Sequence, residues 1–158
     1  MSEAAPEQRR VSRVLILDPL DRVLLLRFRL RDGREVWIPP GGGVDPGETA
    51  ADAGLREVRE ETGVVVSGPL HLVWLRTAHY FQRDVIESYF VTRLPVTSEV
   101  VLEVVPSAPA DLLEYRWWPV AEIARAPSEV EFTPRDIAIR LQPLLVDELP
   151  VEPVAFAD

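Results

Sequence analysis

The sequence contains no cysteine, no lysine and no apolar run long enough to cross a membrane. Without cysteine the chain has no disulfide bond, thiol nucleophile or thiolate metal site. A membrane-spanning helix needs roughly 18 or more apolar residues in succession, and the polar first ten residues lack the apolar core of a secretion signal. We therefore expect a cytoplasmic protein with no membrane partner.

The charge of the chain is strongly one-sided. Its formal net charge is −9 at pH 7, and all 17 basic residues are arginine. This excess of negative charge argues against binding of long nucleic acid through a basic surface. A nucleotide ligand remains compatible with it, because a metal ion can neutralise phosphate groups locally. The exclusive use of arginine fits phosphate recognition, although codon bias in a GC-rich genome is the simpler cause.

Length and composition predict a single domain. A chain of 158 residues, 47% of them hydrophobic, can bury one full core. We place a flexible arm at residues 1–10, the domain at residues 11–145 and a C-terminal tail at residues 146–158, where prolines interrupt any periodic pattern. No internal repeat or linker divides the chain further.

Hydrophobic patterning predicts the remaining elements. Strands are expected where apolar residues alternate or run between turn residues. A helix is expected to open with Thr133 as its cap and Pro134 in its first turn, and to end or kink at Pro143. The other predicted elements are strands at 11–17, 22–31, 36–38, 70–81, 85–94, 100–105 and 114–118, and a short helix at 120–125.

The segment from Gly42 to Val64 combines a glycine-rich turn with one amphipathic helix. Its apolar side recurs every three to four residues, which is the spacing of a single helical face. Thr49 stands where the helix should start, and Gly63 where a left-handed cap usually ends one. The residues of the apolar face are Ala51, Leu55, Val58 and Thr62.

Three glutamates, Glu57, Glu60 and Glu61, fall in one wedge of this helix, opposite its apolar face. Local electrostatics disfavours the arrangement. Glu57 and Glu61 are like charges four residues apart, and all three stand at the carboxyl end of the helix, where its dipole opposes anions. Each effect costs a few tenths to about 1 kcal/mol. A sequence that breaks local rules this consistently is typical of a functional site.

The residues leave two interpretations of the acidic wedge. Most charge runs are solvated helix faces. Here, however, the small residues Ala50 and Ala53 leave room beside the carboxylates, and three successive glycines, residues 41–43, allow the backbone to approach a ligand closely. Clustered oxygen ligands of this kind suit Mg²⁺, with Mn²⁺ as a substitute. We therefore favour a metal site.

The same segment resembles the signature of the Nudix (MutT-type) hydrolase family. That signature is a glycine, five residues, glutamate, seven residues, Arg-Glu, an aliphatic, any residue, Glu-Glu, any residue, glycine and an aliphatic. A chance match is rarer than roughly one in a hundred million starting positions. The chain matches every position of the signature, at Gly42, Glu48, Arg56, Glu57, Val58, Glu60, Glu61, Gly63 and Val64. A weaker resemblance extends over about residues 10–145.

The resemblance implies an α/β (α+β) fold, an α/β/α sandwich around a mixed β-sheet. It also implies a Mg²⁺-dependent pyrophosphohydrolase that cleaves a phosphoanhydride bond in a nucleoside diphosphate linked to X. The substrate class would include nucleoside triphosphates, nucleotide sugars and dinucleoside polyphosphates, and a homodimer stays open. The alternative is a non-catalytic module that senses a nucleotide or binds a partner, which a degraded glutamate set would favour. A third possibility is a diphosphate isomerase of the same fold, but such an enzyme typically needs a catalytic cysteine, and the chain has none.

The resemblance also assigns roles within the signature. Glu57, Glu60 and Glu61 would hold the metal, and the carbonyl oxygen of Gly41 would be a backbone ligand. Of the two remaining polar residues, Arg56 would orient a carboxylate through a charge-assisted hydrogen bond, and Glu48 would support the loop and bound waters.

The general base and the substrate contacts are less defined by the sequence. Glu57 is the first choice for the base, with Glu87 and Glu114 as alternatives or further metal contacts. On the strand at residues 22–31, Arg27 and Arg29 either lie on a solvated face or reach a substrate phosphate. Aromatic residues could stack on a base or belong to the core, and Tyr80 stands about where some dinucleoside-polyphosphate hydrolases of the family carry a tyrosine. The aromatic candidates are Trp37, Tyr80, Phe81 and Trp117.

Overall fold

The computed structural model describes residues 8–80, 82–95 and 108–158, and within these ranges nine strands form one mixed sheet. Three helices accompany the sheet: α1 (Ala50–Thr62), α2 (Val120–Arg125) and α3 (Ile137–Leu145). The strands are β1 (Arg9–Leu17), β2 (Arg22–Arg29), β3 (Glu35–Ile38), β4 (Gly41–Gly43), β5 (His71–Tyr80), β6 (Arg83–Arg93), β7 (Leu112–Pro119), β8 (Glu131–Phe132) and β9 (Val154–Ala157).

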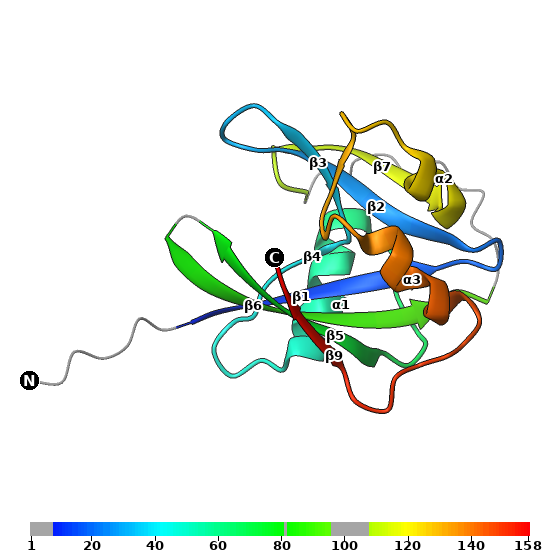
Figure 1. The fold of residues 1–158 in the computed structure, drawn as a ribbon. Coiled ribbons are helices and arrows are strands. Elements are labelled where there is room, and N and C mark those ends of the chain that lie inside the picture. The colour runs from blue at the N-terminus through cyan, green and yellow to red at the C-terminus, as the bar shows by residue number, and fades with distance from the viewer. Residues whose placement is uncertain (1–7, 81, 96–107) are drawn as a thin grey trace, which may run out of the picture.

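The sheet is mixed because one long parallel pair joins antiparallel hairpins. Its main order is β8-β3-β2-β1-β6-β5-β9, with β4 paired to β1 and β7 paired to β2. Strands β1 and β6 run parallel along the whole of β1, whereas β2–β3 and β5–β6 are antiparallel hairpins. Figure 1 shows the two hairpins projecting on the same side of the molecule.

Alternation along β1 builds two cores and thereby the predicted sandwich. Val14 and Ile16 face α1 and pack with Val58, while Leu15 and Leu17 face the opposite way and pack with α2 and α3. Both sets are fully buried. Since successive strand side chains point to opposite faces, one apolar strand serves both layers. The α/β/α expectation is confirmed.

Helix α1 begins and ends where the sequence predicts. The Oγ1 of Thr49 accepts a hydrogen bond from the Asp52 amide at 3.1 Å, as an N-cap does. Gly63 takes a left-handed conformation with φ 72°, and its amide donates to the Arg59 carbonyl. This φ favours glycine because a Cβ would be strained there.

The last helix starts later and runs further than predicted. The amide of Thr133 donates to the Trp37 carbonyl at 2.9 Å, which keeps Thr133 beside the sheet, and α3 begins only after Asp136. Pro143 lies inside α3, which continues for two residues. A proline so close to the carboxyl end removes only one of the last amide bonds and leaves the helix to end soon afterwards.

Two terminal segments also differ from the expectation. Arg9 and Arg10, assigned to a flexible arm, belong to β1 and pair with β6. The segment interpreted as a tail contains β9, which pairs in parallel with β5, and its Phe156 ring contacts Trp74. Strand β9 has four residues and follows two prolines, so no periodic pattern could reveal it. The predicted strand at residues 100–105 lies outside the described residues, as does Phe81.

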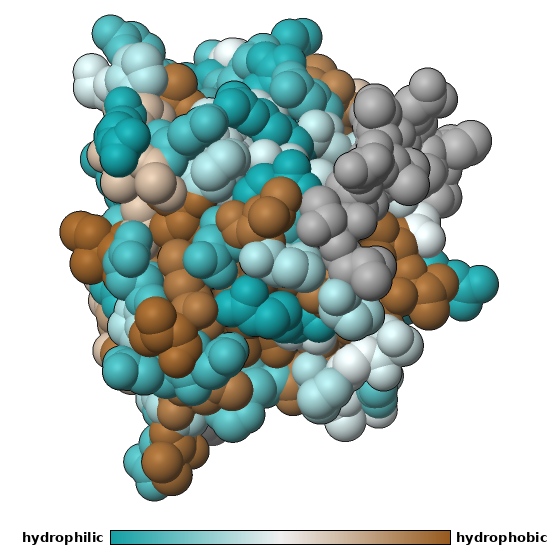
Figure 2. Space-filling view, turned by 90° about the vertical axis from the view of Figure 1, so that its right-hand side faces the viewer, coloured by the Kyte–Doolittle hydropathy of each residue, from teal (hydrophilic) through white to brown (hydrophobic). Residues whose placement is uncertain are grey.

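No helix in residues 8–80, 82–95 or 108–158 is long and apolar enough to span a bilayer. On the face shown in Figure 2, apolar residues are interleaved with polar ones. The exposed large apolar side chains are Leu20, Val65, Ile139, Val146, Leu149, Val151 and Val154.

Helix α1 should depend on Val58 for its attachment to the sheet. Val58 is fully buried, so Val58→Ala should lower the free energy of unfolding by about 1–3 kcal/mol, as urea denaturation would measure. Val65→Ala is the matched control, because Val65 is exposed and its truncation should change stability by less than about 0.5 kcal/mol. Equal costs for the two substitutions would contradict the packing described.

Candidate functional site

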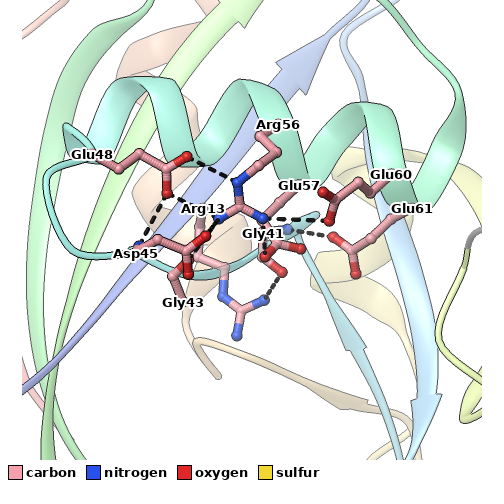
Figure 3. A network of polar contacts seen from close by, with 9 residues as sticks. All are labelled: Arg13, Gly41, Gly43, Asp45, Glu48, Arg56, Glu57, Glu60 and Glu61. Carbon is pink, nitrogen blue, oxygen red and sulfur yellow. Dashed lines mark hydrogen bonds and ion pairs between the residues drawn. The ribbon is translucent and has the colours of Figure 1, made fainter.

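One guanidinium group joins the loop after β4 to helix α1. Arg56 donates two hydrogen bonds to the carboxylate of Glu48, from Nε at 2.8 Å and from Nη2 at 3.0 Å. Its Nη2 also donates to the Gly43 carbonyl at 3.0 Å, and its Nη1 donates to Glu57 at 3.0 Å and to Glu60 at 3.3 Å. Figure 3 shows Arg56 between Glu48 on one side and the other glutamates on the other.

The bidentate contact shifts the pKa values of both Glu48 and Arg56. Hydrogen bonds from Arg56 hold the pKa of the Glu48 carboxyl down at about 2, and the same bonds raise the pKa of Arg56. Glu48 also accepts a hydrogen bond from the Asp45 amide at 3.0 Å, so it fixes the loop as well as the guanidinium. Glu48 and Arg56 therefore stay ionised and paired at neutral pH.

Glu57 lies directly against the backbone of β4. A Cβ on Gly42 would stand 2.5 Å from the Glu57 carboxylate, closer than such atoms approach. A side chain at this position would displace the carboxylate, so glycine is what leaves Glu57 in its observed place. The glycine of the signature thus makes a recess that Glu57 fills.

Glu61 is buried, contrary to its predicted place on an open wedge. It is 3% exposed, and its Oε1 accepts a hydrogen bond from the Gly41 amide at 2.7 Å. Burial raises the pKa of Glu61 to about 7, although the Gly41 amide and Arg13 oppose the rise. The helix wheel could not show this, because the cover comes from β4 and from Tyr115, whose hydroxyl donates to the Glu61 carbonyl.

The glutamates fit a divalent cation by their chemistry, although they do not converge on one point. Within residues 8–80, 82–95 and 108–158, no three acidic or histidine side chains are gathered closely enough to hold a metal as they stand. The hydrogen bonds to Glu57 and Glu61 each use one carboxylate oxygen. Three carboxylates beside a glycine backbone are the hard oxygen donors that Mg²⁺ prefers. Small side-chain rotations would be needed to direct them at one ion.

Arg13 connects this network to the other face of β4. Its Nη1 donates to the Gly41 carbonyl at 3.3 Å, and this is the oxygen that the family resemblance implies as a metal ligand. Its Nε lies 3.6 Å from the carboxylate of Glu87. Arg13 therefore contacts both the signature loop and the strands beyond it.

Glu87 is an anchor for arginines rather than an accessible carboxylate. It is 1% exposed and accepts hydrogen bonds from Arg76 Nη1 at 2.7 Å and from the Tyr89 hydroxyl at 2.8 Å. Burial opposes ionisation, yet Arg13 and Arg76 keep the pKa of Glu87 below its ordinary value. These contacts leave Glu87 poorly placed to take a proton from a water molecule.

An arginine-rich cleft lies between the β2–β3 hairpin and the β5–β6 hairpin. Its volume is about 570 Å³, which lies in the range of small-molecule sites. The predicted Tyr80 lines it and accepts a hydrogen bond from Arg76 at 2.6 Å. A wider cleft of about 970 Å³ adjoins it beside the loop at residues 43–47. The arginines of the first cleft are Arg9, Arg13, Arg31, Arg34, Arg76 and Arg135.

Arg27 and Arg29, the predicted substrate contacts, and Glu114, an alternative base, line neither cleft. Arg27 binds Glu35 at 2.5 Å and Glu114 at 2.6 Å, and Arg29 binds Glu35 at 3.0 Å. They form a ladder of ion pairs across β3, β2 and β7. These contacts favour the solvated-face interpretation of Arg27 and Arg29.

Sequence reasoning missed Arg13 and Arg76, although a signal was present. Arg76 stands between Trp74 and Ala78 on the buried side of β5, and Glu87 stands between Val85 and Tyr89 on the buried side of β6. A charge on an apolar strand face needs a partner. The hairpin register pairs Arg76 with Glu87.

Comparison with known proteins gives a family and a fold. A family model described as the NUDIX domain matches residues 7–138. The chain belongs to the Nudix family. Among solved structures, a MutT protein from Methanosarcina mazei Go1 superposes with a TM-score of 0.64 at 23% identity, over 86% of this chain and 95% of that one. At that identity the likeness supports the fold alone.

Curated Nudix relatives match over shorter stretches. A bis(5'-nucleosyl)-tetraphosphatase from Mus musculus is 50% identical over 42 residues, which is 27% of this chain and 29% of the relative. An m7GpppN-mRNA hydrolase from Danio rerio is 46% identical over 56 residues, which is 34% of this chain and 19% of the relative. The matches thus span less than a third of each relative.

The pairing of Arg56 with Glu48 predicts a measurable pKa change. Arg56→Gln should raise the pKa of Glu48 from about 2 towards its ordinary 4.5, as an NMR titration of the carboxyl carbon would show. Because folding lowers this pKa, the pair stabilises the fold above pH 4.5 and loses this effect as the pH falls towards 2. The difference in melting temperature between the wild-type protein and Arg56→Gln should therefore become smaller as the pH falls towards 2. Arg59→Gln, on an exposed turn of α1, should leave the Glu48 titration unchanged.

Proposed function

We propose that this Nudix domain is a Mg²⁺-dependent pyrophosphohydrolase that cleaves a phosphoanhydride bond in a nucleoside diphosphate linked to X. The observation that carries the proposal is the intact set of signature glutamates, placed by Arg56 and the glycines of β4 at one end of α1. A non-catalytic nucleotide sensor would not need carboxylates that local electrostatics disfavours. Mn²⁺ is expected to substitute for Mg²⁺.

Each residue of the network has a chemical task in this proposal. Glu57, Glu60 and Glu61 hold the cation, which when bound neutralises the phosphates and lowers the pKa of water. Arg56 keeps Glu57 and Glu60 directed towards the site, and Glu48 keeps Arg56 in place. The Gly41 amide holds Glu61 against the loop.

Glu57 is the proposed general base. The other two candidates lie on other strands: Glu87 is buried between Arg13 and Arg76, and Glu114, on β7, pairs with Arg27. Glu57 also accepts a hydrogen bond from an arginine and, like Glu114, lines neither cleft; it is preferred because it stands with the other glutamates of the signature helix. Glu57 is partly accessible at the recess beside Gly42. A carboxylate that can reach water beside the phosphate is required for proton transfer.

The substrate is proposed to lie in the arginine-rich cleft, close to Arg13. The six arginines that line the cleft outnumber its four carboxylates, which favours an anionic ligand such as phosphate, and its size admits a nucleotide. The names of the two curated relatives both describe substrates in which phosphates join two nucleosides. Dinucleoside polyphosphates are therefore the first class to test, followed by nucleoside triphosphates and nucleotide sugars.

A hydrolysis screen with matched variants tests this proposal. The wild-type chain should release phosphate-containing products from at least one nucleotide compound with Mg²⁺, and Glu61→Gln should reduce turnover by about 100-fold or more. The same variant should keep or raise the melting temperature, because it removes a buried charge repelled by Glu57. Val58→Ala should lose stability but retain turnover per folded molecule.

Two results would contradict the proposal. Near-normal turnover in Glu61→Gln would remove the acidic wedge from the chemistry. Inactivity of the wild type against the whole panel, with binding of one of its nucleotides shown by calorimetry, would favour a non-catalytic nucleotide sensor instead.

A further inference from the structure

The arginine-rich cleft contains a carboxylate from the chain itself. Asp158, which follows β9, binds Arg76 with both of its carboxylate oxygens: Nε donates to Oδ1 at 3.0 Å, and Nη2 donates to Oδ2. Figure 1 shows the C end of the chain between the two hairpins that border the cleft. Asp158 is one of the lining residues.

Contacts on one side of the Arg76 guanidinium hold it in place, so only its other side can bind a ligand. Its Nη1 donates to Glu87 at 2.7 Å and to the Tyr80 hydroxyl at 2.6 Å. The side chain of Arg76 is 4% exposed, whereas that of Asp158 is 53% exposed. The remaining edge of the guanidinium, Nε and Nη2, therefore presents two parallel donors to the cleft, and Asp158 takes both.

The charges around Nε and Nη2 of Arg76 are balanced when one anion is bound there. Arg13 and Arg76 together carry two positive charges, and the buried carboxylate of Glu87 balances one of them. Asp158 supplies the second negative charge. A group that displaced Asp158 would have to bring a negative charge and two acceptor oxygens.

A phosphate group meets that description, because arginine binds carboxylate and phosphate through the same pair of donors. We infer that Nε and Nη2 of Arg76 form a phosphate-binding subsite of the cleft, and that Asp158 is an internal ligand which a phosphate of the substrate displaces. The role of the subsite in turnover rests on the function proposed above. The anion binding itself does not.

The attachment of Asp158 allows such an exchange. Strand β9 lies at the edge of the sheet and is held by pairing with β5, by the contact of Phe156 with Trp74, and by Arg140 over the Phe156 ring at 3.4 Å. Asp158 lies beyond these contacts, so its side chain can leave Arg76 while β9 stays paired. An internal ligand that occupies a site part of the time weakens the apparent affinity of an external one by the same fraction.

Calorimetric titration of inorganic pyrophosphate into the full chain, with a chelator to remove divalent ions, tests the inference. Asp158→Asn should bind pyrophosphate about two- to tenfold more tightly than the wild type at low ionic strength, and the gain should shrink in high salt. Glu152→Gln is the matched control, because it removes the same charge from an exposed position of the same segment that does not line the cleft. It should bind like the wild type.

A variant of Arg76 shows whether the gain in pyrophosphate affinity arises at the Arg76 guanidinium. Arg76→Lys keeps the positive charge beside Glu87 but loses the paired donors, so it should bind pyrophosphate more weakly, and adding Asp158→Asn to it should bring little further change. Circular dichroism melts verify that each variant is folded. If Arg76→Lys does not fold, the comparison of Asp158→Asn with Glu152→Gln decides alone.

The outcomes separate this inference from the proposed function. Equal affinities for Asp158→Asn, Glu152→Gln and the wild type, or no detectable binding to any of them, would overturn the subsite. Tighter binding by Asp158→Asn in a chain that hydrolyses nothing would support the subsite and count against the enzyme. With an active enzyme, Asp158→Asn should lower KM.

Discussion

The contact of Arg56 with Glu48 and Gly43 holds the rest of the site in place. Helix α1 carries its acidic residues where its own dipole opposes them, so the helix alone would not keep them there. One guanidinium ties the loop to the helix and neutralises part of that charge. The recess at Gly42 then sets the position of Glu57, and the Gly41 amide sets that of Glu61. The site is thus a loop and a helix joined through one side chain.

The glycine strand β4 brings the two halves of the site together. Arg56 reaches the Gly43 carbonyl from α1, while Arg13 reaches the Gly41 carbonyl from β1. Beyond Arg13, Glu87 and Arg76 carry the contacts into the cleft. A chain of charged side chains therefore runs from the proposed metal ligands to the proposed phosphate subsite. Such an arrangement fits a reaction in which a cation and arginines share the charge of a polyphosphate.

Local signals in the sequence predicted the centre of the molecule well. The helix from Thr49 to Gly63 follows from periodicity and caps, which depend on neighbours in the chain. The mixed sheet joins distant strands and was expected from the resemblance alone. What failed depends on distant contacts. The burial of Glu61 comes from β4, the late start of α3 from the bond of Thr133 to Trp37, and β9 from docking on β5. The ion pairs of Arg27, Arg29 and Glu114 also join separate strands, so no single-strand pattern could choose between the two interpretations of these arginines.

We propose that the acidic end of α1 binds a divalent cation. Anomalous diffraction from crystals of the wild-type chain grown with Mn²⁺ would locate that cation. We expect one strong peak about 2.1 Å from carboxylate oxygens of at least two of Glu57, Glu60 and Glu61, on the side facing Gly41. A Mn²⁺ peak confined to other carboxylates, or no peak at this helix end at saturating metal, would contradict it.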